Sequence, residues 1–100
     1  MYIYNVTTQV KEFIQVEWLE WMRNDFIPEM IATELFSYYR IVKILDIDES
    51  DGPTYAIQYF TDSRAKYDQF VQLYSNKFSQ KAIEKWKDKI FSFRSLMEVI

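Results

Sequence analysis

The feature that most limits the possible folds of this chain is an alternation of strand-like and helix-like segments along all 100 residues. The segments follow the order strand, helix, strand, strand, helix, strand, and one glycine and two prolines supply most of the breaks between them. Two strand–helix–strand halves joined by a hairpin are typical of the ferredoxin-like arrangement. We therefore predict an α+β chain with a ferredoxin-like βαββαβ fold, in which a four-stranded antiparallel sheet carries two helices on one face. A chain of this length is expected to form one domain over residues 1–100.

The expected strands combine alternating polarity with β-branched and aromatic residues. Residues 2–10 alternate between two faces, as a half-buried strand does. Residues 36–47 and 54–60 are rich in β-branched and aromatic side chains and form a predicted hairpin. The acidic segment 48–53 contains a glycine and a proline, which suit the reversal between them. The last strand is expected over residues 90–99.

Apolar residues at helical spacing predict the two helical regions. The first begins near Phe13, and Pro28 is expected to break or kink it near residues 26–27, with a further turn of helix over residues 29–33. The second begins after Ser63, which together with the two preceding residues offers an N-cap. Its spacing becomes less regular near Ala82, which favours a second short helix there.

Alternation along the strands divides the sheet residues between two faces. The face covered by helices is predicted to hold Tyr4, Val6, Tyr55, Ile57, Tyr59, Phe91, Phe93, Met97 and Val99. The open face is predicted to hold Ile3, Asn5, Thr7, Tyr38, Arg40, Val42, Ile44, Ala56, Gln58, Phe60, Ser92, Arg94 and Leu96. A bulge would invert the assignment of one strand. The open face is too apolar for water and too polar for a core, and this favours a homodimer formed through it.

Composition excludes several chemistries. The chain has no histidine and no cysteine. It therefore lacks disulfides, a thiolate nucleophile, zinc–thiolate ligands and the commonest general base. We expect neither a metal nor a cofactor. No apolar run is long enough to span a membrane, and the first residues lack the pattern of a signal peptide, so a cytoplasmic location without membrane association is expected.

Nucleic-acid binding is disfavoured, although RNA-recognition domains share this order of elements. The third strand of those domains carries a glycine and a basic residue, whereas residues 54–60 here have neither. The pI is also low, near 4.9.

Charge is divided unevenly along the chain. Residues 1–62 hold 4 basic and 11 acidic side chains, and residues 63–100 hold 8 basic and 4 acidic ones. This pattern fits two solvated helix faces of opposite sign, and it also fits electrostatic complementarity between two copies of the chain.

Several short blocks resemble one protein family in their order and spacing. The blocks are Tyr2-Ile3-Tyr4-Asn5-Val6-Thr7, Trp18-Leu19-Glu20-Trp21-Met22, Ile27-Pro28, Ala32-Thr33, Thr54-Tyr55-Ala56-Ile57-Gln58-Tyr59-Phe60 and Phe93-Arg94. Along essentially the whole chain they resemble the bacterial family known as domain of unknown function 4286. The resemblance implies a small cytosolic protein with no assigned activity and an architecture similar to the dimeric α/β-barrel superfamily, in which two ferredoxin-like sheets face each other.

That superfamily includes cofactor-independent monooxygenases, heme-degrading enzymes and small isomerases, so the fold alone does not choose a chemistry. Heme degradation typically uses a histidine ligand, which this chain lacks.

Two groups of residues are candidates for a site. The first is the polar set Asn5, Arg40, Gln58 and Arg94. If all four share one sheet face, they could bind an anionic small molecule, because an arginine grips a carboxylate or phosphate well. They could instead hydrogen-bond to one another or across a dimer interface.

The second group contains Tyr4, Tyr55 and Tyr59 with Trp18 and Trp21. These aromatic residues could line a pocket between the sheet and the helices that binds a flat aromatic compound, or they could simply form the core. A third group, the acidic residues at 46–51, resembles a calcium loop but has the wrong register of ligands, so we interpret it as a solvated turn.

Two functions remain open at this stage. The first is a homodimeric binding or interaction module, which the mixed open face and the lack of a catalytic constellation favour. The alternative is a small cofactor-independent monooxygenase or isomerase-like enzyme that acts on an aromatic or anionic metabolite. Catalysis there would depend on Tyr, Arg, Asn, Asp or Glu side chains with shifted pKa values.

Overall fold

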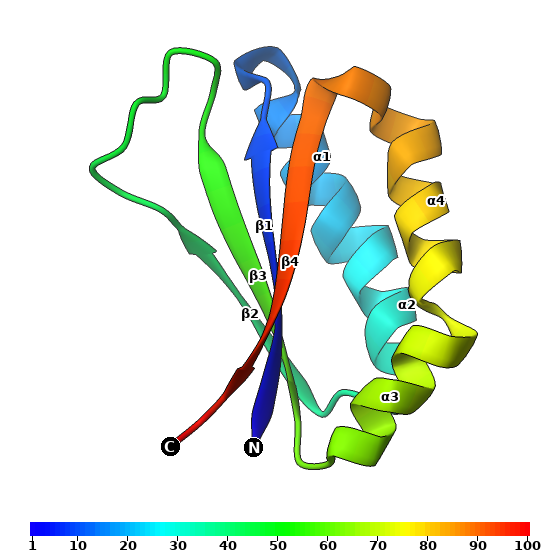
Figure 1. The fold of residues 1–100 in the computed structure, drawn as a ribbon. Coiled ribbons are helices and arrows are strands. Elements are labelled where there is room, and N and C mark those ends of the chain that lie inside the picture. The colour runs from blue at the N-terminus through cyan, green and yellow to red at the C-terminus, as the bar shows by residue number, and fades with distance from the viewer.

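The structure, a computed structural model, describes residues 1–100 and contains one antiparallel sheet with all helices on one side of it (Figure 1). The strands are β1 (Tyr2–Val10), β2 (Tyr38–Lys43), β3 (Thr54–Thr61) and β4 (Ile90–Glu98). Their spatial order is β2-β3-β1-β4, with every neighbouring pair antiparallel. This is the ferredoxin-like arrangement, so the predicted fold class is confirmed.

The first helical region runs without a break past Pro28. It consists of η1 (Glu12–Ile14), α1 (Gln15–Trp21), the π-helical turn η2 (Met22–Phe26) and α2 (Ile27–Ala32). The chain stays helical across residues 26–27, so the alternative of a break is wrong, although the helix type does change there from π to α. The N–H of Ile27 bonds to the carbonyl of Met22, five residues back, and Pro28 occupies the first turn of α2. An N–H is dispensable in a first helical turn, so the wider turn accommodates the proline.

The second helical region is split at Tyr74, where φ is −127°, and not near Ala82 as predicted. It consists of α3 (Arg64–Leu73), α4 (Ser75–Trp86) and the short η3 (Lys87–Lys89). No helix is both long enough and apolar enough to cross a membrane.

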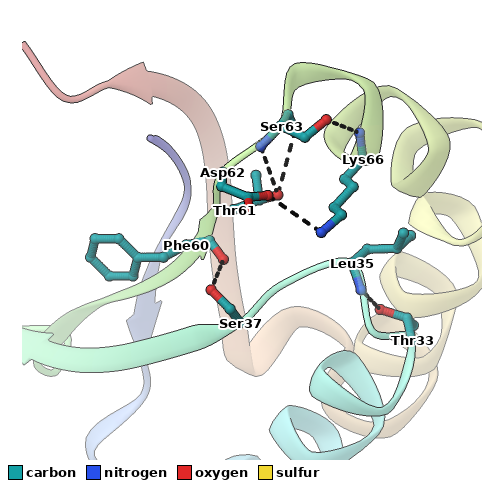
Figure 2. A network of polar contacts seen from close by, with 8 residues as sticks. All are labelled: Thr33, Leu35, Ser37, Phe60, Thr61, Asp62, Ser63 and Lys66. Atoms are coloured by element: carbon teal, nitrogen blue, oxygen red, sulfur yellow. Dashed lines mark hydrogen bonds and ion pairs between the residues drawn. The ribbon is translucent and has the colours of Figure 1, made fainter.

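Side-chain hydrogen bonds fix the points where helices meet strands (Figure 2). The hydroxyl of Ser63 accepts from the N–H of Lys66, which makes it the N-cap of α3, and the ammonium of Lys66 contacts Asp62. At the end of α2, Thr33 donates to the carbonyl of Met30 and accepts from the N–H of Leu35. These bonds satisfy backbone groups that helix ends otherwise leave unpaired.

The core lies between the sheet and the helices and is strongly aromatic. Tyr4 stands at its centre, with ring centroids of Phe36, Tyr59 and Phe70 at 6.0, 6.0 and 5.3 Å. The rings of Phe36 and Phe70 meet edge to face at 5.0 Å. Contacts of this geometry add to the stabilisation from burial alone.

Strand register places the residues of β1, β2 and β3 on the faces predicted for them. Val6 pairs with Ile57 on the helix-covered face, and Asn5 pairs with Gln58 on the other. Arg40 also pairs with Gln58 and therefore shares the open face. Ile44 and Val99 directly follow the last residues of β2 and β4, and the strand register does not include them.

The prediction for β4 is wrong and its two faces are exchanged. Arg94 pairs with Val6, and Ser92 pairs with Thr8, which places both on the helix-covered face together with Leu96. The side chains assigned to the core by alternation, Phe91, Phe93 and Met97, lie on the open face instead. The set that contains Phe91, Phe93 and Met97 is the more apolar of the two, so polarity alone favours the wrong face for it.

The β2–β3 loop folds back onto the end of β1. The N–H of Val10 bonds to the carbonyl of Pro53 at 2.9 Å, and Gly52 is buried with φ of 124°. A Cβ at Gly52 would lie 2.0 Å from the carbonyl oxygen of Val10. Only glycine fits there, because the conformation and the close approach both exclude a side chain.

The acidic residues of the same loop are exposed. Asp48 accepts a hydrogen bond from the N–H of Ser50, and this bond lowers the pKa of the Asp48 carboxyl. No group of three or more His, Cys, Asp or Glu side chains is placed to hold a metal ion.

The uneven charge of the chain is matched within the molecule. The ammonium of Lys81 on α4 lies 2.7 Å from Asp25 and 2.9 Å from Glu29 on the first helical region. Desolvation acts to lower the pKa of Lys81, but these two hydrogen-bonded carboxylates together outweigh it and raise the pKa. Complementarity between the acidic and basic halves therefore joins the two helical regions of one chain.

Candidate functional site

A cavity lies between the helix-covered face of the sheet and the helices. Its lining residues, 18 in all and 13 of them hydrophobic, are Tyr4, Val6, Thr8, Trp18, Trp21, Met22, Phe26, Met30, Ile57, Tyr59, Phe70, Ser75, Phe78, Ser79, Ala82, Ile90, Ser92 and Arg94. The cavity and its open mouth enclose about 510 Å³, and the room inside for water-sized molecules is about 50 Å³. That is enough for a few waters or for part of a small ligand.

One charged side chain, Arg94, belongs to this lining. It is also the exposed member of the set, so it marks the mouth of the cavity. One of its Nη atoms donates to the hydroxyl of Ser79 at 2.9 Å, and no carboxylate lies within ion-pair distance of it. The guanidinium therefore keeps most of its five N–H donors free for another acceptor.

Two tyrosines place phenol groups in the lining. Burial raises the pKa of Tyr59 far above its ordinary value, and the neighbouring Tyr4 adds to the shift. Burial also raises the pKa of Tyr4, although the positive charge of Arg94 opposes that shift. Both phenols are therefore neutral around pH 7 and can donate a hydrogen bond.

Four of the five predicted pocket residues line this cavity: Tyr4, Trp18, Trp21 and Tyr59. Tyr55 does not. Its hydroxyl accepts from Gln15, and its ring packs against Trp18 with centroids 5.5 Å apart.

Sequence reasoning missed Arg94 and Ser79 as lining residues. The signal for Arg94 was its parity with Ile90 and Leu96 along β4. That alternate set is the more polar of the two, so alternation of polarity alone points away from it.

The predicted polar set does not form one site. Asn5, Arg40 and Gln58 lie together on the open face, whereas Arg94 lies on the opposite face. The Nε of Arg40 donates to the Gln58 side chain at 2.6 Å, and the Asn5 amide donates to Thr7 at 3.0 Å. These three polar side chains thus satisfy part of their hydrogen-bonding capacity on the sheet itself.

The open face is otherwise apolar along both edge strands. On β4 the exposed fractions of Phe91 and Phe93 are 68% and 57%, and on β2 that of Tyr38 is 59%. Met97 and Val42 extend the two apolar edges. Figure 1 shows no element of the chain over this side of the sheet. Exposed apolar surface of this extent is typical of an interaction surface.

Comparison with known proteins identifies a family and a fold. The family model described as Domain of unknown function (DUF4286) matches residues 1–100. Among solved structures, a protein described as a dimeric ferredoxin-like protein from an uncultured marine organism superposes with a TM-score of 0.68 at 10% sequence identity. The match covers 99% of this chain and 94% of that one, and at this identity it supports the fold alone. No curated protein matches the sequence.

Proposed function

We propose that this chain, which belongs to the DUF4286 family, is a homodimeric binding module that holds a small apolar ligand between its sheet and its helices. The observation that carries the proposal is the cavity in the aromatic core, lined by 13 hydrophobic residues and open at the guanidinium of Arg94. Small-molecule sites are typically concave and apolar, with a few polar groups that fix orientation. The cavity has both properties.

The lining favours binding over catalysis. It contains no carboxylate, and its two phenols have raised pKa values. A phenol whose pKa is raised by burial stays protonated near neutral pH, so it offers no phenolate base, and as an acid it gives up its proton reluctantly. An effective general acid or base has a pKa near the working pH. The alternative of a cofactor-independent enzyme therefore receives less support than a ligand-binding role.

The homodimer is proposed on the open face. Its apolar edges, formed by β2 and β4, are exposed in a single chain. The polar residues Asn5 and Gln58 lie on the two strands between these edges, and Arg40 lies on β2 itself. A twofold axis parallel to the sheet and just outside its open face would bring two such faces together and remove both sets of apolar side chains from water. The related fold described as dimeric gives a precedent for this assembly. The expected species in light scattering has twice the chain mass of 12.2 kDa.

The cavity is tested with indole, a neutral and flat probe. We expect indole to raise the melting temperature and to shift the indole N–H NMR signals of Trp18 and Trp21, which line the cavity. The Ala82→Phe variant adds a ring to the lining and should abolish these effects. Ile83→Phe is the matched control, because Ile83 is the next residue of α4 and is 54% exposed.

If indole produces no shift at Trp18 and Trp21 in the unmodified protein, the ligand-binding proposal is wrong. The same conclusion follows if Ala82→Phe folds, as judged by circular dichroism, and binds indole as tightly as Ile83→Phe.

A further inference from the structure

We infer that the ligand of this cavity is an aromatic monocarboxylate, with its carboxylate at Arg94 and its ring among the buried aromatic side chains. This inference rests on the proposed ligand-binding function and names the chemical class of the ligand. It depends on the position of one unpaired cation at the mouth and on the chemistry of the cavity floor.

The cation is available to a ligand. Four of the twelve Lys and Arg side chains, Lys43, Arg64, Lys66 and Lys81, form ion pairs with carboxylates. Arg94 is not among them, and its partners, the hydroxyl of Ser79 and the phenol of Tyr4, are neutral. A guanidinium beside an apolar cavity gains a charge-assisted hydrogen bond when it meets a carboxylate oxygen. Arginine is also suited to this contact because its planar fork matches the carboxylate group.

The charge of the lining favours one negative charge on the ligand. Arg94 is the single charged residue there, and the other polar side chains of the lining are neutral hydroxyls and phenols. A monocarboxylate is neutralised by one guanidinium. A phosphate monoester near neutral pH would bring up to a second negative charge without a second cation to meet it.

The floor of the cavity favours an aromatic body. Trp18, Met30 and Phe70 are 2%, 1% and 1% exposed, so this end is dry and apolar. The rings of Phe26 and Phe78 meet edge to face at 5.4 Å, and both line the cavity. A ligand ring can join such a cluster in the offset or edge-to-face contacts that aromatic groups prefer.

The test compares 3-phenylpropanoate with its neutral analogue 3-phenylpropanamide by NMR and calorimetric titration. We expect the acid to bind the unmodified protein at least about tenfold more tightly than the amide, because a hydrogen bond to a charged group contributes more than a neutral one. Arg94→Gln should reduce the affinity for the acid by a similar factor and leave the amide unchanged. Arg64→Gln is the matched control, since Arg64 is an exposed arginine paired with Asp68 outside the cavity.

The outcomes separate this inference from the proposed function. If indole or the amide binds while the acid gains no advantage, the cavity stands and the carboxylate class is wrong. If Arg64→Gln weakens the acid as much as Arg94→Gln, the effect is general electrostatics and the inference is also wrong. If indole, the acid and the amide all fail to bind, the proposed function itself fails. The acid–amide comparison needs no variant, so it remains decisive even if Arg94→Gln does not fold.

Discussion

Replacing Phe93 perturbs the proposed dimer at one of the most exposed aromatic side chains of the open face. Phe93 is on β4, its exposed fraction is 57%, and it pairs with Thr7 on the central strand. If two sheets pack face to face, this side chain loses its contact with water in both protomers. Its removal should therefore weaken the dimer without disturbing the core on the other side of the sheet.

The magnitude follows from the exposed fraction. Complete burial of a phenylalanine side chain contributes about 1.5–3 kcal/mol, so burying the exposed share of Phe93 contributes about 0.9–1.7 kcal/mol per protomer. Two symmetry-related copies give about 2–3 kcal/mol, which corresponds to a roughly 30- to 150-fold weaker dissociation constant for Phe93→Ala. Phe93→Glu should dissociate the dimer fully at micromolar concentration, because it also places two carboxylates in an apolar contact.

Light scattering and sedimentation over a wide concentration range measure this effect. The matched control is Val71→Glu, because Val71 is an apolar residue of α3 with a similar exposed fraction of 48% and lies in the helical layer, away from the open face. Phe93→Glu should give the monomer mass while Val71→Glu keeps the dimer mass, and both should retain the far-ultraviolet circular dichroism of the parent. The assignment of the interface is refuted if the dimer survives Phe93→Glu or if Val71→Glu dissociates it equally. It is also refuted if the unmodified chain is a monomer at every concentration.

Two further predictions concern stability. Gly52→Ala should lower the free energy of unfolding by about 2–4 kcal/mol in urea titrations, because its Cβ would meet the carbonyl of Val10 in a conformation that disfavours side chains. The control Ser50→Ala, in the same loop, should have little effect. Equal losses of stability for the two variants would contradict this explanation. The free energy of unfolding should also fall above pH 10, because the raised pKa values of Tyr4 and Tyr59 keep both phenols protonated in the folded state while the unfolded chain releases these protons. The decrease should reach up to about 1.4 kcal/mol per pH unit for each tyrosine. Tyr59→Phe should make that dependence shallower in urea titrations at pH 9, 10 and 11, and an unchanged slope would show that Tyr59 is not responsible.

Much of the fold could be predicted because local signals and the global arrangement agree. Residues 2–10 alternate strictly and form β1 over that range, and Ser63 caps α3 by the hydrogen bond that its position suggested. The helix continues past Pro28 for a local reason that single-residue propensity does not contain. A π-helical turn moves the bonding pattern by one residue, and the sequence carries no separate signal for it.

The candidate site was predictable only in part, since it depends on how distant elements meet. Trp18 and Trp21 lie at helical spacing and Tyr4 and Tyr59 at strand spacing, so their convergence on one cavity follows once the helices cover the correct face. The place of Arg94 depends on the register of β4 against β1. That register is set by pairs such as Val10 with Ile90, which are 80 residues apart in the sequence.

The exchanged faces of β4 are themselves informative about function. Assigning the most apolar alternate set of a strand to the core is reliable when only one face of a sheet is removed from water. Here the rule fails because Phe91 and Phe93 on the open face are larger than Ile90 and Ser92 on the core face. In a free monomer, large aromatic residues are expected on the core side of a strand and an arginine on the solvent side. β4 departs from this pattern on both of its faces. A partner sheet over Phe91 and Phe93, with a ligand beside Arg94, would explain both departures, since residues that violate local rules tend to lie where a protein binds something.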